Sequence, residues 1–341
     1  MSLKRKRDMD EILKSRSVNF VVGPKRTMYT VHSASLTALS QPLKELIVPN
    51  RRRIGYGTVV WLHVEPSTFI NLMEYAYSRD YTIADLPKKK NSGKNSAESR
   101  ESGSVKYETD SDDDKSSSED EAYLPARPIT TASAGKKPDT GTDGAEKADS
   151  LYSWILEVSK SPNSPQHWCA QYKFCLENFP IDTTVNGPTD AWLKGNQLQH
   201  DSGYQAVLKT HLNLYFLADE HEITELKDLC LERIRLTLLH APGTSEVASS
   251  VLDAIHVVYA NTDIGNPLRS LLVKYCATDM EWMMGGGGGG GVVQITPVIR
   301  GVPGFAADLL LEIPHAYWKE VGDGGAAGLE RLRSSRLAST V

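Results

Sequence analysis

A long stretch with almost no large apolar residues divides this chain and limits where a packed core can form. Among the 63 positions of 88–150, the large apolar side chains are those of Val105, Tyr107, Tyr123, Leu124 and Ile129. Such a segment cannot bury enough apolar surface to offset the conformational entropy that it loses on ordering. The sequence therefore predicts a disordered insert over 88–150 and a core built from the segments on either side.

The insert also accounts for the charge of the chain. Its part 98–121 holds ten acidic and three basic residues, a net −7, whereas the formal net charge of all 341 residues is −5. The rest of the chain is therefore slightly basic, and we assign the negative charge to a tail-like insert rather than to a folded surface.

Shifts in composition divide the remaining chain. Seven glycines, Gly285–Gly291, cannot hold a helix or strand economically and indicate a linker. Four prolines in 151–202 predict one helix at about 151–159 and irregular packing after it. The predicted organisation is a basic N-terminal tail at 1–14, the first part of a domain at 15–87, the disordered acidic insert at 88–150, a partly ordered insert at 151–202, the closing helices of the domain at 203–240, a helical extension at 241–284, and a glycine linker and tail at 285–341.

The block 15–87 has the pattern of a small sheet with helices. Two short β-rich runs flank a Gly-Pro turn, which is a hairpin signature. Pro66 suits the first turn of a helix, whose apolar stripe includes Phe69, Leu72 and Tyr77. The predicted elements are strands at 19–22, 28–31 and 58–62, short helices at 33–39 and 43–48, and the helix from Pro66.

The later blocks show helical periodicity. One stripe ends near Ala218 and a second begins at Ile223, each with apolar residues three or four positions apart. Ser245 is a candidate cap for a third helix, and Asn266-Pro267 is a cap followed by a first-turn proline. The inward residues predicted in this way are Val207, Leu208, His211, Leu212, Tyr215, Ala218, Ile223, Leu226, Cys230, Ile234, Val247, Val251, Ile255, Val258, Leu268, Leu271, Leu272 and Tyr275.

These elements together predict an α+β fold. A small β-sheet packs with a cluster of α-helices, a long disordered insert interrupts the domain, and a helical extension follows it. The insertion is tolerable because the entropy of closing a surface loop grows only slowly with its length.

The order and spacing of several motifs resemble the BTB/POZ domain, in particular its fungal members. Phe20-Val21-Val22-Gly23 and Tyr29-x-Val31-His32 are similar to the opening hairpin, after which a helical hairpin begins at the histidine. Tyr77-Ser78-Arg79-Asp80-Tyr81 is similar to the "YTGDY" turn, and Leu214-Tyr215-x-Leu217-Ala218-Asp219 to a closing helix. The resemblance covers roughly 15–87 and 203–282. It implies a BTB-like fold and a non-enzymatic protein–protein interaction module, a scaffold or adaptor that self-associates or docks a partner.

The sequence departs from the family's pattern at functional positions. Ser17 and Ser33 stand where many members carry an acid and a base that form a charged pocket for peptides. The loop 49–57 is basic and lacks the hydrophobic-x-Glu motif of cullin-binding members. Two alternatives stay open: a substrate adaptor of a cullin ubiquitin ligase, acting through this loop, and a nuclear nucleic-acid-associated regulator, acting through Arg51-Arg52-Arg53 or the N-terminal basic run. Of the two partners, nucleic acid is the less favoured.

No pattern for catalysis or a cofactor is found. The GxSxG, HExxH, Walker and GxGxxG motifs are absent, and no cysteine pair has CxxC spacing. His167, Cys169 and Cys175 lie near one another, but a zinc site needs about four ligands. His32 is interpreted as a structural residue at the strand-to-helix turn. We therefore expect no catalytic, cofactor-binding or metal site, no cofactor and no enzyme activity.

The N-terminus and the insert carry signals of regulation. Lys4, Arg5, Lys6 and Arg7 form a compact basic run of the kind that import receptors bind. Ser111, Ser116, Ser117 and Ser118 each have an acidic residue three positions later, as acidophilic kinases require. With neither a signal peptide nor a long apolar run, we expect a soluble, non-secreted protein of the nucleus or cytoplasm. Its partners are expected to be proteins, a second copy among them, and not a membrane. Met9, Ile12 and Leu13 could form an exchanged arm in such a dimer or simply cover their own domain.

Overall fold

A computed structural model describes the regions on both sides of the predicted insert. The described residues are 9–47, 58–83, 150–160, 162–163, 169–181, 203–278, 295–313 and 315–316. The predicted disorder of 88–150 and the glycine run Gly285–Gly291 therefore lie outside the described residues, apart from Ser150 at the end of the insert.

A three-stranded sheet opens the fold, as the sequence predicts. The strands β1 (Ser17–Val22) and β2 (Thr27–His32) pair antiparallel, and β3 (Thr58–Trp61) joins β1 in parallel, which gives the order β2-β1-β3. The hairpin turn begins at Gly23, whose positive φ of 72° favours glycine. A Cβ added there would meet Pro66 Cδ at 3.0 Å, so the turn also needs glycine for space.

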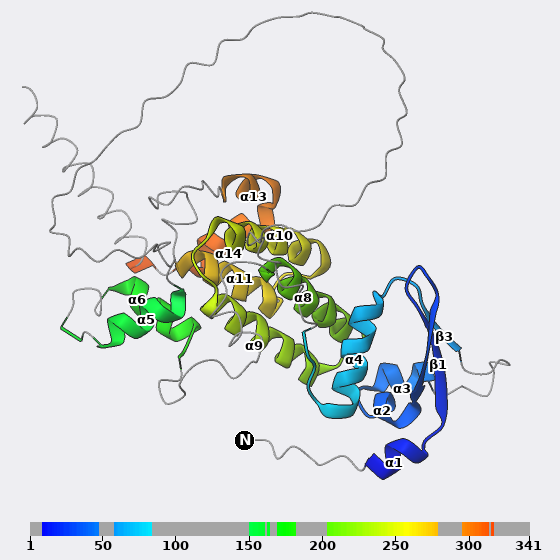
Figure 1. The fold of residues 1–341 in the computed structure, drawn as a ribbon. Coiled ribbons are helices and arrows are strands. Elements are labelled where there is room, and N and C mark those ends of the chain that lie inside the picture. The colour runs from blue at the N-terminus through cyan, green and yellow to red at the C-terminus, as the bar shows by residue number, and fades with distance from the viewer. Residues whose placement is uncertain are drawn as a thin grey trace, which may run out of the picture. The chain divides into compact units, whose positions relative to one another are not determined.

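Helices cover one face of this sheet (Figure 1). They are α2 (Ser33–Thr37), α3 (Gln41–Ile47) and α4 (Pro66–Ser78), and α1 (Met9–Lys14) precedes β1 within the span predicted as a tail. The rings of Phe20 and Trp61 from the sheet and Phe69 from α4 have centroids 5.1 to 6.0 Å apart. The predicted α4 stripe is correct at Phe69 and Leu72, whereas Tyr77 is half-buried and Tyr75 is fully inside.

Two long helices complete the domain from the far side of the insert. They are α8 (Tyr204–Glu220) and α9 (Thr224–His240), and every inward residue predicted for them is buried. α8 packs against α4, and the His221 ring at the end of α8 stacks on Trp61 of β3 at 4.8 Å. One continuous hydrophobic core therefore includes residues from both sides of the insert.

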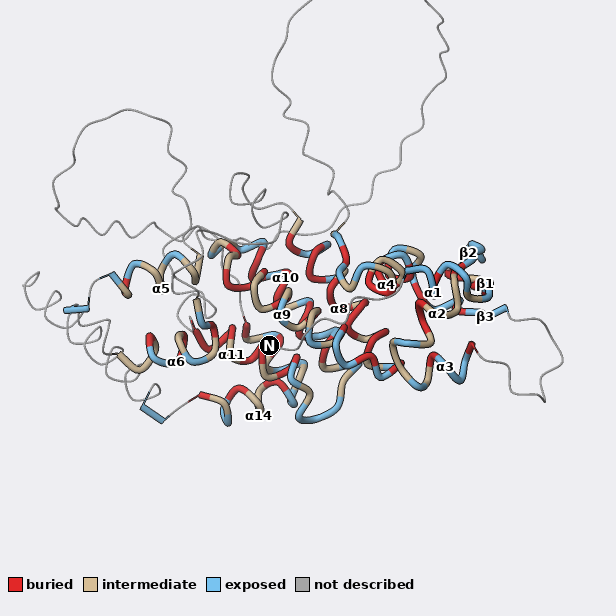
Figure 2. Tube along the Cα trace, turned by 90° about the horizontal axis from the view of Figure 1, so that it is seen from below, coloured by how far each residue is buried: buried red, intermediate tan, exposed pale blue. Residues whose placement is uncertain are grey.

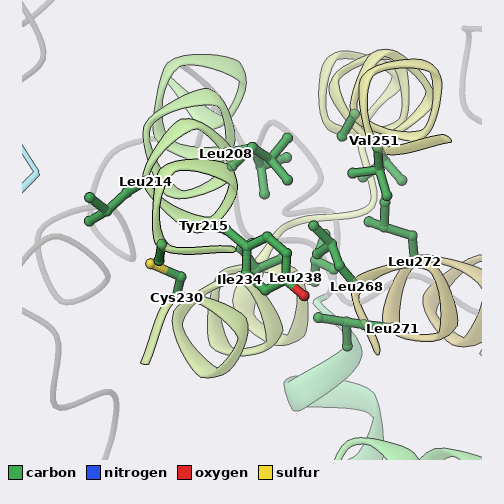
Figure 3. Close-up of a cluster of buried hydrophobic side chains, with 14 of the residues drawn as sticks. Leu208, Leu214, Tyr215, Cys230, Ile234, Leu238, Val251, Leu268, Leu271 and Leu272 are labelled. Carbon is green, nitrogen blue, oxygen red and sulfur yellow. The ribbon is translucent and has the colours of Figure 1, made fainter. Parts of the chain in front are cut away.

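The predicted helical extension is present. It consists of α10 (Ser245–Asn261) and α11 (Pro267–Thr278), whose apolar stripes meet those of α8 and α9 in the cluster of Figure 3. The α10 cap is Thr244 rather than Ser245, because the Thr244 side chain accepts the hydrogen bond from Val247 N. Asn266 caps α11 as predicted, with Oδ1 accepting from Leu268 N, and it also accepts from the buried Tyr215 hydroxyl.

Two regions contain more helix than the sequence predicts. In 151–202, α5 (Leu151–Lys160) is present as expected, but α6 (Ala170–Asn178) replaces part of the irregular packing. In 285–341, expected to be a linker and tail, α13 (Thr296–Gly301) and α14 (Pro303–Glu312) pack against α10, and α14 also packs against α11.

The two acidic side chains of α14 face α10 and α11. Asp308 accepts a 2.7 Å hydrogen bond from the Tyr259 hydroxyl, and Glu312 pairs with Lys274 at 3.0 Å. Leu310 and Leu311, in contrast, are 66% and 84% exposed. Figure 2 shows buried, intermediate and exposed parts along α14. Among the described helices, none is both long and apolar enough to cross a membrane.

Candidate functional site

Most of the residues singled out from the sequence as signals lie outside the described residues. This holds for the import run Lys4–Arg7, for the phosphorylation candidates Ser111 and Ser116–Ser118, and for the loop residues 49–57, on which the cullin alternative depends. Those predictions therefore stay predictions.

His32 has the structural position that the sequence suggests. It precedes α2, and both its backbone N–H and its ring Nδ1 lie within hydrogen-bond distance of the Tyr77 hydroxyl, at 3.1 and 2.9 Å. Its contacts tie the end of β2 to α4.

The cysteine and histidine side chains within the described ranges are not gathered into a metal site. Among these residues, no group of three or more His, Cys, Asp or Glu side chains is placed to hold a metal ion. Cys169 Sγ accepts a hydrogen bond from Tyr172 N at the start of α6, while Cys175 is buried. His167 lies outside the described residues.

A pocket of about 280 Å³ lies between the turn that joins β3 to α4 and one face of α8. The turn contributes His63, Val64 and Glu65, and α8 contributes side chains at helical spacing from Asn213 to Glu220. Asn261, at the end of α10, completes the wall. The pocket is thus assembled from three segments that are far apart in the sequence.

Polar contacts hold the two sides of the pocket together. Glu65 bridges to α8 by accepting from Lys209 Nζ at 3.0 Å and from Asn213 Nδ2 at 3.3 Å. On the other side, His63 Nε2 lies 3.7 Å from Glu220 Oε2. The side chains of both pairs are more than half exposed, so each contact contributes little to stability, and their role is to position the side chains.

A buried polar cluster fastens the end of the first block onto α8 and α9. The Tyr81 hydroxyl lies 2.7 Å from His211 Nδ1 and donates to Cys230 Sγ at 3.5 Å. Arg233 stacks over the Tyr81 ring at 4.2 Å, donates to the Tyr81 carbonyl and pairs with Asp80 at 2.6 Å. These contacts therefore anchor Asp80 and Tyr81, close to the last described residues before the insert, to α8 and α9.

Burial determines the protonation of this cluster. Desolvation lowers the pKa of His211 to about 3, with a smaller contribution from the Arg233 charge, so the imidazole is neutral at pH 7. Desolvation likewise raises the pKa of the Cys230 thiol to about 12 and raises that of Tyr81. At neutral pH the cluster thus holds neither a thiolate nor an imidazolium, and we interpret it as structural.

The sheet face that the helices leave open carries no acidic side chain, lysine or arginine at its strand positions. Alternation along the strands gives its outward positions as Ser17, Asn19, Val21, Met28, Thr30, His32, Thr58 and Val60. Met28, Val21 and Val60 are register partners and form an apolar row across all three strands. Met28 and Val60 are 65% and 58% exposed. Exposed apolar side chains that lie next to one another on a surface, as in this row, are typical of interaction sites.

The N-terminal segment forms α1, with one apolar side chain inside and two outside. Ile12 is 4% exposed, whereas Met9 and Leu13 are 44% and 57% exposed. Both predicted roles of this segment, an exchanged arm or a cover for its own domain, stay predictions.

Comparison of the chain with protein-family models, with curated protein sequences and with solved structures finds no match in any of the three. Function is therefore inferred from the residues and the geometry alone.

Proposed function

We propose that this protein is a non-enzymatic interaction module of the BTB/POZ type that self-associates through the outer face of its sheet. The observation that carries the proposal is an outer face without acidic, lysine or arginine side chains at its strand positions, crossed by the apolar row Met28–Val21–Val60. Exposed apolar patches on soluble proteins commonly mark interaction sites. A second copy fits this face because an uncharged surface meets its own two-fold mate without like-charge repulsion.

The arrangement of the elements supports the family assignment within this proposal. A hairpin leads into a helix at His32, a parallel third strand follows, and the turn ending at Tyr81 closes α4. Two closing helices then return from beyond the insert. This is the order that the sequence resemblance to the BTB/POZ family implies.

Sedimentation equilibrium of the full-length chain at tens of micromolar tests the proposal. We expect a dimer for the wild type and a monomer for Val60→Lys, because a lysine there would bury a charge between two apolar rows. The matched control is Val257→Lys on α10, where the valine is 42% exposed and is not part of the sheet, so this variant should remain a dimer. A monomeric wild type, or equal dimerisation of Val60→Lys, would contradict the proposal.

A further inference from the structure

We propose that the pocket between the β3–α4 turn and α8 binds a single basic side chain, arginine or lysine, presented by a partner protein. The pocket shares no residue with the outer sheet face, so it is a second site that does not depend on self-association. Its volume of about 280 Å³ is just below the usual range for small-molecule sites, which favours one side chain over a larger ligand.

The apolar part of the pocket suits the stem of such a side chain. Val64 and Leu217 are 5% and 4% exposed, and Phe216 also lines the pocket. Lysine and arginine place their methylene groups against apolar surface and keep the charged head among polar groups. An acidic or purely polar side chain would gain nothing from this surface.

The polar part of the pocket includes two carboxylates and two amide oxygens that can accept hydrogen bonds. Asn213 and Asn261 each use the amide nitrogen as a donor, Asn213 to Glu65 and Asn261 to Val257 O at 2.7 Å. The carbonyl oxygen of each amide is then the group that remains to accept. Together with the carboxylates of Glu65 and Glu220, these oxygens match the several N–H donors of a guanidinium or ammonium group.

Two carboxylates contribute unequally to this site. Glu65 already accepts from Lys209 Nζ at 3.0 Å, so a bound cation competes with Lys209 for it. Glu220 has a longer, 3.7 Å contact with His63 and is more readily available. Removing the Lys209 charge should therefore strengthen binding, whereas removing the Glu220 charge should weaken it.

Ligand-observed NMR titration of the full-length chain tests this inference. The probe is the blocked peptide acetyl-Gly-Ala-Arg-Ala-Gly-amide, and the matched probe replaces arginine with citrulline, which has nearly the same shape but no charge. We expect millimolar binding of the arginine peptide only, because one side chain offers few contacts. Glu220→Gln should weaken it about two- to fivefold, the range for a partly exposed ion pair, and Lys209→Met should strengthen it to a similar degree.

Glu222→Gln is the matched control. Glu222 is an exposed acid two positions after Glu220 and does not line the pocket, so its neutralisation should leave binding unchanged. Thermal unfolding of each variant checks that the fold is kept. Equal binding of the arginine and citrulline peptides, an equal effect of Glu220→Gln and Glu222→Gln, or no binding at several millimolar peptide would overturn the inference.

Discussion

Replacing His211 with glutamine should remove a large part of the acid sensitivity of this protein. The folded-state pKa of His211 is lowered to about 3, whereas an unfolded histidine has a pKa of about 6.5. The unfolded state therefore takes up the proton first as the pH falls. Above about pH 6.5 His211 does not change the free energy of unfolding. Between about pH 6.5 and pH 3, protonation of His211 in the unfolded state lowers that free energy more and more as the pH falls.

The size of the effect follows from the two pKa values. Linkage with a folded pKa near 3 and an unfolded pKa near 6.5 gives a loss of about 2 kcal/mol in the free energy of unfolding between neutral pH and pH 5. His221 and His240 also have lowered pKa values because of burial, so the wild type loses more than this. The difference between wild type and His211→Gln isolates the contribution of His211.

Urea unfolding at pH 7.5 and pH 5.0 measures this difference. Glutamine does not titrate in this range, and its amide can still hydrogen-bond the Tyr81 hydroxyl, so His211→Gln should lose about 2 kcal/mol less than the wild type between the two pH values, whatever its stability at pH 7.5. His256→Gln changes an exposed histidine of α10 and should retain the wild-type pH dependence. If wild type and His211→Gln lost equal stability, the buried, neutral state of His211 would be refuted.

Four further tests concern the packing and the backbone. Leu212→Ala truncates a 4% exposed side chain of α8 and should lower the free energy of unfolding in urea by about 2–5 kcal/mol. Leu311→Ala, at an 84% exposed position, should lower it by less than about 0.5 kcal/mol. Similar losses for the two variants would show that the helix faces are misassigned. Glu222→Gly should raise the melting temperature, because Glu222 has φ 54° after α8 and a left-handed residue other than glycine costs about 1–2 kcal/mol. Gly23→Ala should lower the melting temperature, because φ is 72° there and the new Cβ would meet Pro66; a rise would contradict the turn geometry. A single proteolytic cut within 84–149 should leave both fragments together on native size exclusion, since they share one core, and separation of the fragments would contradict that core.

The sequence by itself determined the elements whose signals are local. Periodicity placed the inner faces of α8 to α11 correctly, because three- and four-residue spacing reports the buried side of an amphipathic helix directly. The hairpin and the start of α4 were predicted because glycine tolerates the positive φ of a tight turn, whereas proline fixes φ at a value that suits the first turn of a helix. The Ser245 cap was off by one residue because serine and threonine are both good caps and only the hydrogen bond distinguishes them.

Elements without a polar and an apolar face could not be found in this way. α14 is apolar on both sides, and its two acids point inward to Tyr259 and Lys274, so its sequence shows no stripe that separates it from a tail. α6 follows a proline-containing stretch and has almost no apolar asymmetry. Both helices are present because α11 packs against them, which is a contact over a long sequence distance.

The tertiary structure alone decided which polar residues act together. Arg233 and Tyr81 are 152 positions apart, and Glu65 and Asn213 are 148 apart, with the insert between them in both pairs. Spacing in the sequence carries no information about such partners, because chain geometry correlates positions only over a few turns of helix or across a hairpin. The pocket and the buried cluster therefore exist only once the core has brought α8 and α9 against the sheet and α4.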